Sequence, residues 1–337
     1  MRSQERRTTR TLIGLVAGLS LVAAACGSDT DDSAPAEDEA PVTTVEEVAV
    51  EEVAEEEAEE DAMEEEAMEE EAMEEGDVVP VRIVSLSPTH TEILFAIGAG
   101  DQVVAVDDFS NFPAEALELP NELSGFEPNI EAIAAFEPDL VVLSGDSAVE
   151  QLDELGIATW VGSAATGFDD TYAQIEQLGA ATGNVGDAAE LVSSMQIRID
   201  ELVANAPETE TSLTYFHELS PDLFSTTSDT FIGQQYELLG LVNIAGSSED
   251  TDGNQFPQLN AEVVIEANPD LIFLADTKCC AETADTVAAR DGWDAIAAVQ
   301  NGNVIEMDDD IASRWGPRLV DYMVAIAAAV EQASVPA

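Results

Sequence analysis

The sequence predicts an α/β fold with two similar lobes, each built on a parallel sheet, on either side of one long helix. Three observations lead to this prediction. Short apolar strands alternate with helical segments, which is typical of parallel sheets covered by helices on both faces. The second half of the chain repeats the pattern of the first half. Between the halves, residues 187–206 carry apolar side chains at helical spacing, and Pro207 ends that helix.

The first lobe is expected to span residues 81–186. It opens with an apolar strand, which Ser87-Pro88 ends, and the helix that follows stops at Gly98. Strand and helix then alternate to the end of the lobe. The predicted strands are 81–86, 103–106, 140–143 and 158–161, and the predicted helices are 92–97, 130–136 and 149–155.

The second lobe is expected to span residues 210–337, after the connecting helix at 187–206. A helix of about 20 residues is roughly 30 Å long, which is enough to run along two lobes. Beyond it the alternation of strand and helix starts again. The predicted strands are 212–216, 271–275 and 304–307, and the predicted helices are 232–239 and 318–331.

An internal repeat relates the two lobes. The segment from Pro128 is PNIEAIAAFEPDLVVL, and the segment from Leu259 is LNAEVVIEANPDLIFL. Glu131 aligns with Glu262, 131 positions later (262 − 131), and Asp139 aligns with Asp270 at the same spacing (270 − 139). Parallel sheets bind ligands at the carboxyl ends of their strands. We therefore expect a ligand cleft between two facing lobes.

The N-terminus predicts export and a lipid anchor. Several arginines precede an apolar run from Leu12 to Ala25 that is too short for a permanent membrane span. Small residues then lead directly to Cys26, as in a bacterial lipoprotein signal. We predict that residues 1–26 are this signal, that Cys26 is lipidated after cleavage, and that the protein lies on the outer face of the cytoplasmic membrane. An ordinary signal peptide with a chance cysteine is the alternative.

Residues 27–79 form an acidic segment of low complexity. They contain no lysine or arginine, and the block Met-Glu-Glu-Glu-Ala recurs from Met63, Met68 and Met73. A period of five residues matches neither a helical stripe nor a coiled coil. We expect a solvated, self-repelling tether. Weak and unspecific cation binding is the alternative.

The charge balance excludes some partners. The chain has 71 Asp and Glu against 10 Lys and Arg, a formal net charge of −61. Nucleic-acid binding requires clustered positive charge, which the chain does not offer. An acidic surface suits solubility or docking onto a partner with a basic face.

Several segments resemble a known family. VRIVSLSPTHTEILFAIGA from Val81, SNFP from Ser110 and NIEAIAAFEPDLVV from Asn129 are similar to the iron-siderophore/cobalamin family of periplasmic solute-binding proteins. The resemblance runs from about Val81 to Gln332. It implies two Rossmann-like lobes joined by a rigid helix, modest closure on a ligand, and delivery to an ABC permease and ATPase complex.

The resemblance also implies binding without chemistry or a cofactor. The sequence has no Gly-x-Ser-x-Gly, phosphate-binding glycine loop or His-Glu-x-x-His motif. An enzyme or a non-transport lipoprotein on the same fold remains an alternative. We expect a monomer.

Two glutamates are candidates for contact with the permease. In the family, a glutamate on each lobe docks with permease arginines, and the matching positions here are Glu131 and Glu262. Carboxylates on separate lobes would let the permease sense lobe geometry through charge-assisted hydrogen bonds. The alternative is that both are ordinary surface residues, stabilised by the dipole at helix starts.

Candidate ligand residues follow the strand ends. Aromatic rings would cover the flat faces of a chelate, and an arginine would pair with a carboxylate or amide oxygen. The alternatives are core packing for the phenylalanines and an internal salt bridge for Arg314. The expected ligand is a neutral or cationic metal chelate, with a ferric siderophore first and a corrinoid second. The candidates are Thr89, His90, Phe112, His217, Glu218, Phe231, Asp310, Arg314 and Trp315.

The histidines and the paired cysteines leave alternatives open. His90 and His217 are the only histidines, and direct binding of a bare metal ion by both is an alternative to a core or hydrogen-bonding role. Cys279 and Cys280 are adjacent and could close a strained vicinal disulfide at the rim of the cleft. We predict a structural turn for them and no redox function.

Overall fold

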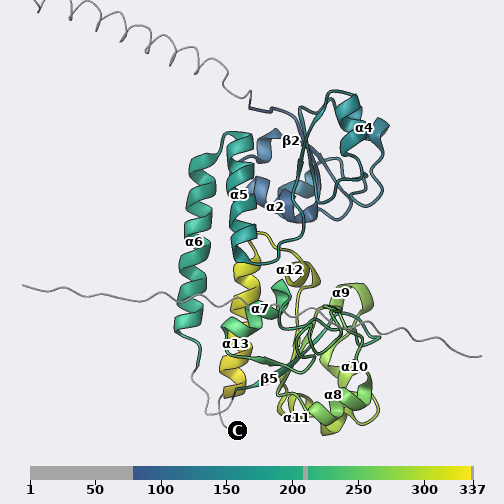
Figure 1. Ribbon diagram of the computed structural model, residues 1–337, viewed down its shortest axis with the longest axis vertical. Coiled ribbons are helices and arrows are strands. Elements are labelled where there is room, and N and C mark those ends of the chain that lie inside the picture. The colour runs from purple at the N-terminus through teal and green to yellow at the C-terminus, as the bar shows by residue number, and fades with distance from the viewer. Residues whose placement is uncertain (1–78, 208–211, 335–337) are drawn as a thin grey trace, which may run out of the picture. The chain divides into compact units, whose positions relative to one another are not determined.

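The computed structural model describes residues 79–207 and 212–334, which belong to one compact unit, Gly76–Ala337 (Figure 1). The predicted lipoprotein signal with Cys26 and almost all of the predicted tether lie outside the described residues. Among the residues described, no helix is both long enough and apolar enough to cross a membrane.

The first lobe contains a parallel four-stranded sheet in the order β2-β1-β3-β4. Every residue of β1 and β3 is buried, as expected for a sheet covered on both faces. The strands are β1 (Ile83–Leu86), β2 (Val103–Val106), β3 (Leu140–Leu143) and β4 (Ala158–Val161), and the helices are α2 (Pro88–Ala96), η1 (Gly100–Gln102), η2 (Ala114–Glu118), α3 (Ile130–Ala134) and α4 (Val149–Glu154).

The second lobe has the same architecture, with a parallel sheet in the order β6-β5-β7-β8. The order of first, second, third and fourth strand is therefore identical in the two sheets. The strands are β5 (Thr214–Glu218), β6 (Val242–Asn243), β7 (Leu271–Leu274) and β8 (Val304–Glu306); the helices are α7 (Phe231–Leu238), α8 (Ala261–Ala267), α9 (Thr277–Cys280), α10 (Ala284–Ala288), η3 (Trp293–Ala295), α11 (Ala297–Asn301) and α12 (Asp309–Ser313).

Three long helices accompany the sheets: α5 (Phe168–Thr182), α6 (Val185–Ala204) and α13 (Leu319–Ser334). Helix α6 is the predicted connecting helix, and it begins and ends two residues earlier than predicted. Helix α5 has no counterpart in the sequence prediction. It packs against α6, as Figure 1 shows, and a side chain on Gly179 of α5 would collide with the methyl group of Ala188 on α6.

The repeat seen in the sequence has matching structural roles. Asn129 and Asn260 cap α3 and α8, and their side chains accept backbone N–H groups of Ala132 at 3.1 Å and Val263 at 2.9 Å. Asp139 and Asp270 both accept backbone N–H groups at the start of the first strand of their lobe. The duplication therefore extends from the strand order to individual hydrogen bonds.

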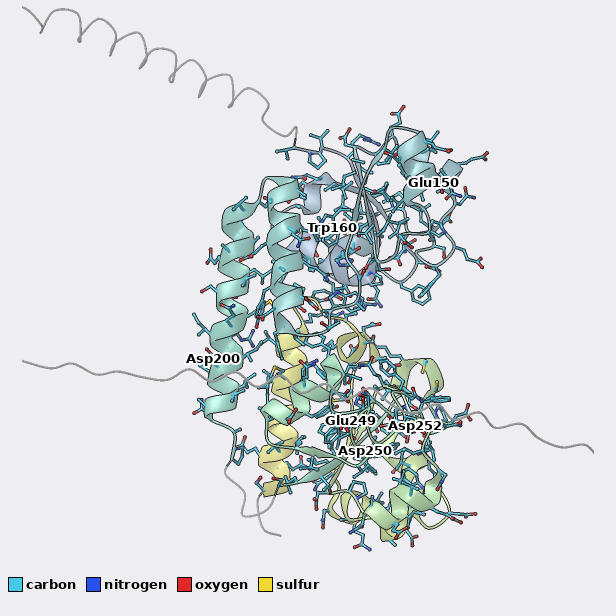
Figure 2. The ribbon with its side chains drawn as sticks, viewed as in Figure 1. Glu150, Trp160, Asp200, Glu249, Asp250 and Asp252 are labelled. Atoms are coloured by element: carbon cyan, nitrogen blue, oxygen red, sulfur yellow. The ribbon has the colours of Figure 1, made fainter. Side chains whose placement is uncertain are left out.

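Acidic side chains cover the outside of the unit. Glu150 on α4, Asp200 on α6 and Asp250 beyond β6 are exposed and point away from the ribbon (Figure 2). This distribution agrees with the large negative net charge of the chain.

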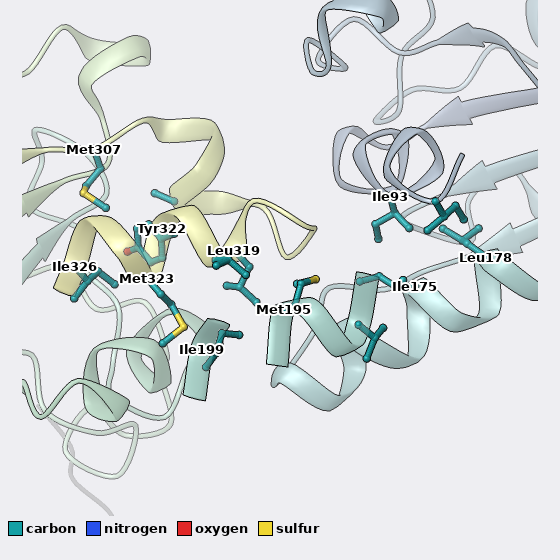
Figure 3. Packing of buried hydrophobic residues seen from close by; sticks show 14 of the residues in the cluster. Ile93, Ile175, Leu178, Met195, Ile199, Met307, Leu319, Tyr322, Met323 and Ile326 are labelled. Atoms are coloured by element: carbon teal, nitrogen blue, oxygen red, sulfur yellow. The ribbon is translucent and has the colours of Figure 1, made fainter. Parts of the chain in front are cut away.

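The apolar core joins the two lobes. One cluster lies within the first lobe around Val84 and Val141, and another lies within the second lobe around Phe216 and Ile272. A third cluster includes residues of both sheets together with α5, α6 and α13 (Figure 3). Because both lobes pack on the same close-packed cluster, we expect only small movements of one lobe relative to the other.

Candidate ligand site

A pocket of about 310 Å³ lies between the lobes. The first lobe contributes residues 164–166, which follow β4, and the second lobe contributes the start of α7 and the loop after β6. Residues 312–315, at the end of α12, line the rest. The pocket therefore lies beside the carboxyl ends of parallel strands, as predicted. Its walls combine apolar side chains such as Phe231, Phe256 and Trp315 with polar ones such as Thr166 and Gln235.

The local sequence fixes the start of α7 at the pocket wall. Thr230 is the N-cap, and its hydroxyl accepts the backbone N–H of Gly233 at 3.0 Å. Any side chain at Gly233 would collide with the backbone of Thr227, so the preceding turn can pack here only against glycine. Phe231 then meets Phe168 of α5 edge to face, with ring centroids 5.2 Å apart.

Gln235 places a hydrogen-bond acceptor at the pocket without a protein donor. The residue lines the pocket and is 3% exposed, and its Oε1 atom has no hydrogen-bond partner among the described residues. Its amide nitrogen donates to the carbonyl of Phe231 at 3.3 Å. An unpaired buried acceptor costs about 1–3 kcal/mol. The oxygen is itself buried, so a ligand N–H or O–H group reaches it only after the side chains around it move.

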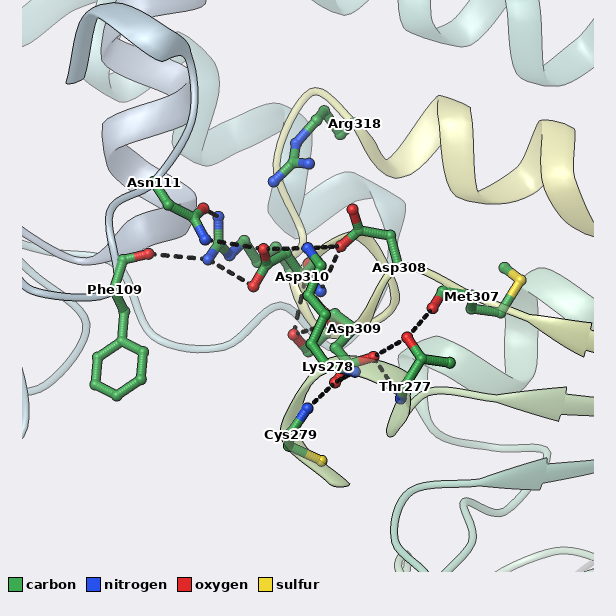
Figure 4. A network of polar contacts seen from close by, with 12 residues as sticks. Phe109, Asn111, Thr277, Lys278, Cys279, Met307, Asp308, Asp309, Asp310 and Arg318 are labelled. Atoms are coloured by element: carbon green, nitrogen blue, oxygen red, sulfur yellow. Dashed lines mark hydrogen bonds and ion pairs between the residues drawn. The ribbon is translucent and has the colours of Figure 1, made fainter. Parts of the chain in front are cut away.

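Arg314 ties α12 to the first lobe. Its Nη1 atom donates to Glu92 at 2.8 Å and to the side-chain oxygen of Asn111 at 2.9 Å. Its Nη2 atom donates to the carbonyl of Phe109 at 3.0 Å and to Asp310 at 3.0 Å (Figure 4). The guanidinium is only 8% exposed and both terminal nitrogens are occupied by protein acceptors.

Asp310 makes a second bridge between the lobes. It accepts from the amide of Asn111 at 2.9 Å and from the ammonium of Lys278 at 2.7 Å (Figure 4). Burial opposes ionisation, but hydrogen bonds from Lys278 and Asn111 and the charge of Arg314 hold the pKa of Asp310 below its ordinary value. Lys278 also donates to Asp308 at 2.5 Å. The carboxylate of Asp310 is therefore ionised and engaged by protein donors.

The other arginines near the strand ends are also paired. Arg318 donates to Glu92 at 2.9 and 2.5 Å, and its guanidinium lies 4.3 Å from the centre of the Phe112 ring. In the second lobe, Arg290 donates to both oxygens of Glu218 at 2.6 and 2.5 Å. Lys278, Arg290, Arg314 and Arg318 are thus all neutralised by carboxylates of the protein.

His90, which was predicted as a ligand residue, lies inside the protein. It is fully buried, and burial lowers its pKa to about 4. The carbonyl oxygen of Gln174 lies 2.9 Å from His90 Nε2 and 3.0 Å from Trp315 Nε1, so both nitrogens donate to it. Since a neutral imidazole has one N–H, Nδ1 accepts from the hydroxyl of Ser87 at 2.7 Å.

His217 is also inside the protein. It is fully buried, burial lowers its pKa to about 3, and Nδ1 lies 2.8 Å from the hydroxyl of Tyr236. The neighbours of His217 differ from those of His90, so the structure does not unite the two rings in one site. Within residues 79–207 and 212–334, no group of three or more His, Cys, Asp or Glu is arranged to hold a metal ion.

Three further predicted ligand residues lie away from the pocket. Glu218 is fully buried against Arg290, and Thr89 is 3% exposed and packs beneath Gly316. Phe112 borders a different hollow, next to α2 and η2. Of the nine candidates, Phe231, Arg314 and Trp315 line the interlobe pocket, and Asp310 contacts Arg314 beside it.

Sequence reasoning missed several pocket residues. Phe256 is 48% exposed at the pocket wall. Its sequence signal is an aromatic residue within an otherwise polar loop segment, residues 246–258. Gln235 has no such signal, because its role depends on burial and on a missing donor. Thr166 and Thr230 carry only the usual features of turns and helix caps.

The predicted docking residues are accessible. Glu131 and Glu262 are exposed and occupy equivalent places in the first turns of α3 and α8, one helix in each lobe. Both positions follow the capping asparagines of the repeat by two residues. Cys279 and Cys280, for which a structural turn was predicted and a vicinal disulfide left open, are free, exposed thiols on the short helix α9.

The chain has the architecture of a two-lobed binding protein. Each lobe is built on a parallel sheet, the lobes share a helical core, and a pocket lies between them beside the strand ends. The periplasmic binding protein family model matches residues 83–311, and the chain belongs to this family.

Named relatives and solved structures agree with that assignment. The chain is 31% identical to the uncharacterized ABC transporter substrate-binding lipoprotein YvrC of Bacillus subtilis, over 74% of this chain and 80% of that protein. It matches the crystal structure of the periplasmic vitamin B12 binding protein BtuF of Vibrio cholerae with a TM-score of 0.64 and 26% identity, covering 77% and 99% of the two chains. The periplasmic heme binding protein HutB of Vibrio cholerae matches with a TM-score of 0.65 and 26% identity, over 74% and 98%.

Proposed function

We propose that this chain is the receptor of an ABC importer and captures a neutral or cationic metal chelate between its lobes. The observation that carries the proposal is the pairing of Lys278, Arg290, Arg314 and Arg318 with protein carboxylates. Of the four, Arg314 lines the pocket, and an anionic ligand there would have to take it from Glu92 and Asp310. Breaking such a buried pair costs about 3–5 kcal/mol. The aromatic walls of the pocket suit an uncharged ligand surface instead.

Among metal chelates, we place a corrinoid first and a ferric siderophore second, which reverses the order favoured by the sequence. Corrinoids carry peripheral amide groups, whose N–H donors suit the polar residues of the pocket wall, such as Thr166 and Gln235. The solved relative BtuF is named as a vitamin B12 binding protein. Haem carries carboxylates and is disfavoured by the absence of an uncommitted arginine or lysine along the described pocket lining.

The size of the pocket indicates how such a ligand would enter. A volume of about 310 Å³ is at the small end of the range for ligand sites, roughly 300–1,000 Å³. We expect one edge of the chelate to occupy the pocket beside Phe231 and Gln235. The bridges from Asn111 to Asp310 and Arg314 open to admit the rest of the ligand. The receptor performs no chemistry on the ligand.

The ligand assignment is tested by titration calorimetry of the full chain with cyanocobalamin, a neutral ferric hydroxamate, haemin, Zn²⁺ and Fe³⁺. We expect saturable binding of cyanocobalamin that Phe256→Ala weakens by about tenfold, or about 1.4 kcal/mol, since an aromatic contact that the ligand buries contributes about 0.5–1.5 kcal/mol beyond its area. Phe112→Ala is the matched control, because Phe112 borders the other hollow. Binding of haemin or a bare ion alone would contradict the proposal.

We also propose that Glu131 and Glu262 dock onto basic residues of the permease. Their exposure and equivalent positions on the two lobes support this role. The double variant Glu131→Lys/Glu262→Lys should abolish uptake of the bound chelate in cells and leave ligand affinity unchanged. The control is Glu150→Lys/Glu266→Lys, which reverses two other exposed glutamates. Normal uptake by the first variant would overturn the docking role.

Finally, we propose that a lipid on Cys26 holds the protein, as a monomer, at the outer face of the cytoplasmic membrane. The description of YvrC as a lipoprotein supports this arrangement. In cells, Cys26→Ser should move the protein from the membrane fraction to the soluble extracytoplasmic fraction. A variant that stays with the membrane would contradict the anchor.

A further inference from the structure

Two neighbouring thiols stand directly beyond the second sheet. Cys279 and Cys280 are both exposed, at the end of the single-turn helix α9 that follows β7. The Sγ atom of Cys279 donates to the carbonyl of Asp276 at 3.7 Å. Two accessible thiols on adjacent residues form a dithiol, which is the reduced form of a disulfide.

The position of α9 depends on one carboxylate. The backbone N–H groups of Thr277, Lys278 and Cys279 all donate to Asp309, each at 2.9 Å (Figure 4). These three bonds satisfy donors at the start of α9 that have no partner within the helix. Helix α9 is thereby fastened to the start of α12.

Helix α9 is also connected to the contact between the lobes. Lys278, which α9 carries, donates to Asp310 at 2.7 Å. Asp310 accepts from Asn111 of the first lobe and from Arg314. A change in the backbone of α9 that moves Lys278 therefore alters the interlobe bridge at Asp310.

A disulfide between adjacent cysteines is incompatible with α9 as a helix. Neighbouring side chains on a helix point about 100° apart, and they do not face each other. A disulfide requires Cβ atoms about 3.5–4.5 Å apart. Closing the ring therefore requires the turn to unwind, and α9 has only four residues to unwind before Ala281, which already has a left-handed backbone at φ 58°.

We propose that Cys279 and Cys280 are a modification site. A small disulfide, such as oxidised glutathione, converts the two thiols into a vicinal disulfide. Formation of this disulfide unwinds α9 and loosens the contact between the lobes. In the first step one cysteine thiolate attacks the small disulfide, forms a mixed disulfide and releases one small thiolate. The second cysteine then attacks its neighbour's sulfur and releases the other. Two cysteine thiols are oxidised, one small disulfide is reduced, and the two protons end on the two small thiols.

The surroundings set the speed of this reaction. Partial burial, the neighbouring Cys280 thiol and the charges of Asp309 and Asp276 raise the pKa of Cys279 to about 12. The thiolate is the nucleophile, so oxidation is slow at neutral pH and accelerates as the pH rises. Disulfides persist outside the cytoplasm, where the relatives of this chain act.

The test measures the cysteines in the full chain and needs no bound chelate. The protein is equilibrated in buffers of oxidised and reduced glutathione, alkylated and cleaved with trypsin, which cuts after Lys278 and Arg290. We expect the peptide 279–290 to appear unalkylated and lighter by two hydrogen atoms in oxidising buffer. Reduction with dithiothreitol should restore the doubly alkylated peptide. A peptide that stays doubly alkylated, or that carries only glutathione, would overturn the ring closure.

Hydrogen exchange tests the structural consequence. In the oxidised protein, the amides of Thr277, Lys278 and Cys279 lose their acceptor on Asp309 and should exchange at least tenfold faster. Cys280→Ser, treated with the same oxidant, should show no acceleration. Cys279→Ser is a second control, because it leaves the exposed end of α9 in place. Equal exchange rates in the oxidised and reduced protein would refute the unwinding of α9.

Discussion

Replacing Asp276 with asparagine should stabilise the protein progressively as the pH rises from 5 to 8. Asp276 is fully buried at the carboxyl end of β7, and neither of its oxygens has a hydrogen-bond partner among the described residues. Burial, and then the nearby charges of Glu218 and Glu282, raise its pKa to about 7 from an ordinary value of 3.8. The charge of Arg290 opposes this rise, but its guanidinium is already shared by the two glutamates.

The sign of the pH dependence follows from proton binding. Between about pH 4 and pH 7 the folded protein keeps the proton of Asp276, whereas the unfolded chain has lost it. The folded state thus binds more protons, and the free energy of unfolding falls as the pH rises through this window. At about 1.4 kcal/mol for each pH unit, the loss between pH 5 and pH 7 is about 3 kcal/mol. Asparagine has no proton to lose, so Asp276→Asn avoids this loss.

Urea denaturation of the full chain at a series of pH values provides the assay. The difference in unfolding free energy between Asp276→Asn and the unmodified protein should grow by about 3 kcal/mol from pH 5 to pH 8 and level off above pH 7. Asp222→Asn is the matched control at an exposed aspartate. A difference that stays constant with pH, or that shrinks as the pH rises, would refute the reasoning.

Three further predictions concern polar groups of the interior and of the contact between the lobes. Glu92→Gln should lower the free energy of unfolding by about 3–5 kcal/mol, because it leaves Arg314 and Arg318 without their shared carboxylate. The control Glu150→Gln, at the surface, should change this free energy by less than about 0.5 kcal/mol. Equal effects of the two variants in urea denaturation would contradict the role of Glu92. His217 is buried as a neutral ring with its pKa lowered to about 3, so the free energy of unfolding falls as the pH drops below 6.5. His217→Asn should remove about 2 kcal/mol of the fall between pH 6.5 and pH 5. If the unfolding free energy of the variant falls as steeply over this range as that of the unmodified protein, the prediction is wrong. Asn111→Ala removes the hydrogen bonds that join Asn111 to Arg314 and Asp310, and it should accelerate ligand association measured by stopped-flow fluorescence. An unchanged association rate would show that these hydrogen bonds do not limit ligand entry.

Much of the fold could be predicted because the pattern is local. Strands β3 and β4 match their predicted ranges to the residue, since each is an apolar run bounded by turn residues. Helix α5 was missed because Thr171, Gly179 and Thr182 interrupt the apolar residues Ile175 and Leu178 on its buried face. Its packing depends on the close approach of α6 at Gly179, which only the three-dimensional structure reveals.

The site was less predictable because its residues are selected by partners far away in the sequence. His90 follows a strand end like a ligand residue, but Gln174, 84 positions later, completes its hydrogen bonds inside the protein. Glu218 likewise ends β5, and Arg290, 72 positions later, occupies it. Phe231, Arg314 and Trp315 do line the pocket, since strand ends in parallel sheets determine the general location of a site.

The most direct test of the charge argument compares cyanocobalamin with a derivative in which one peripheral amide is hydrolysed to a carboxylate. Titration calorimetry at low salt measures both dissociation constants on the same full chain. Because Arg314, Arg318 and Lys278 are held by protein carboxylates, we predict that the carboxylate derivative binds at least about tenfold more weakly, or about 1.4 kcal/mol. Equal or tighter binding of the carboxylate would show that a cation is free for the ligand and would contradict the account.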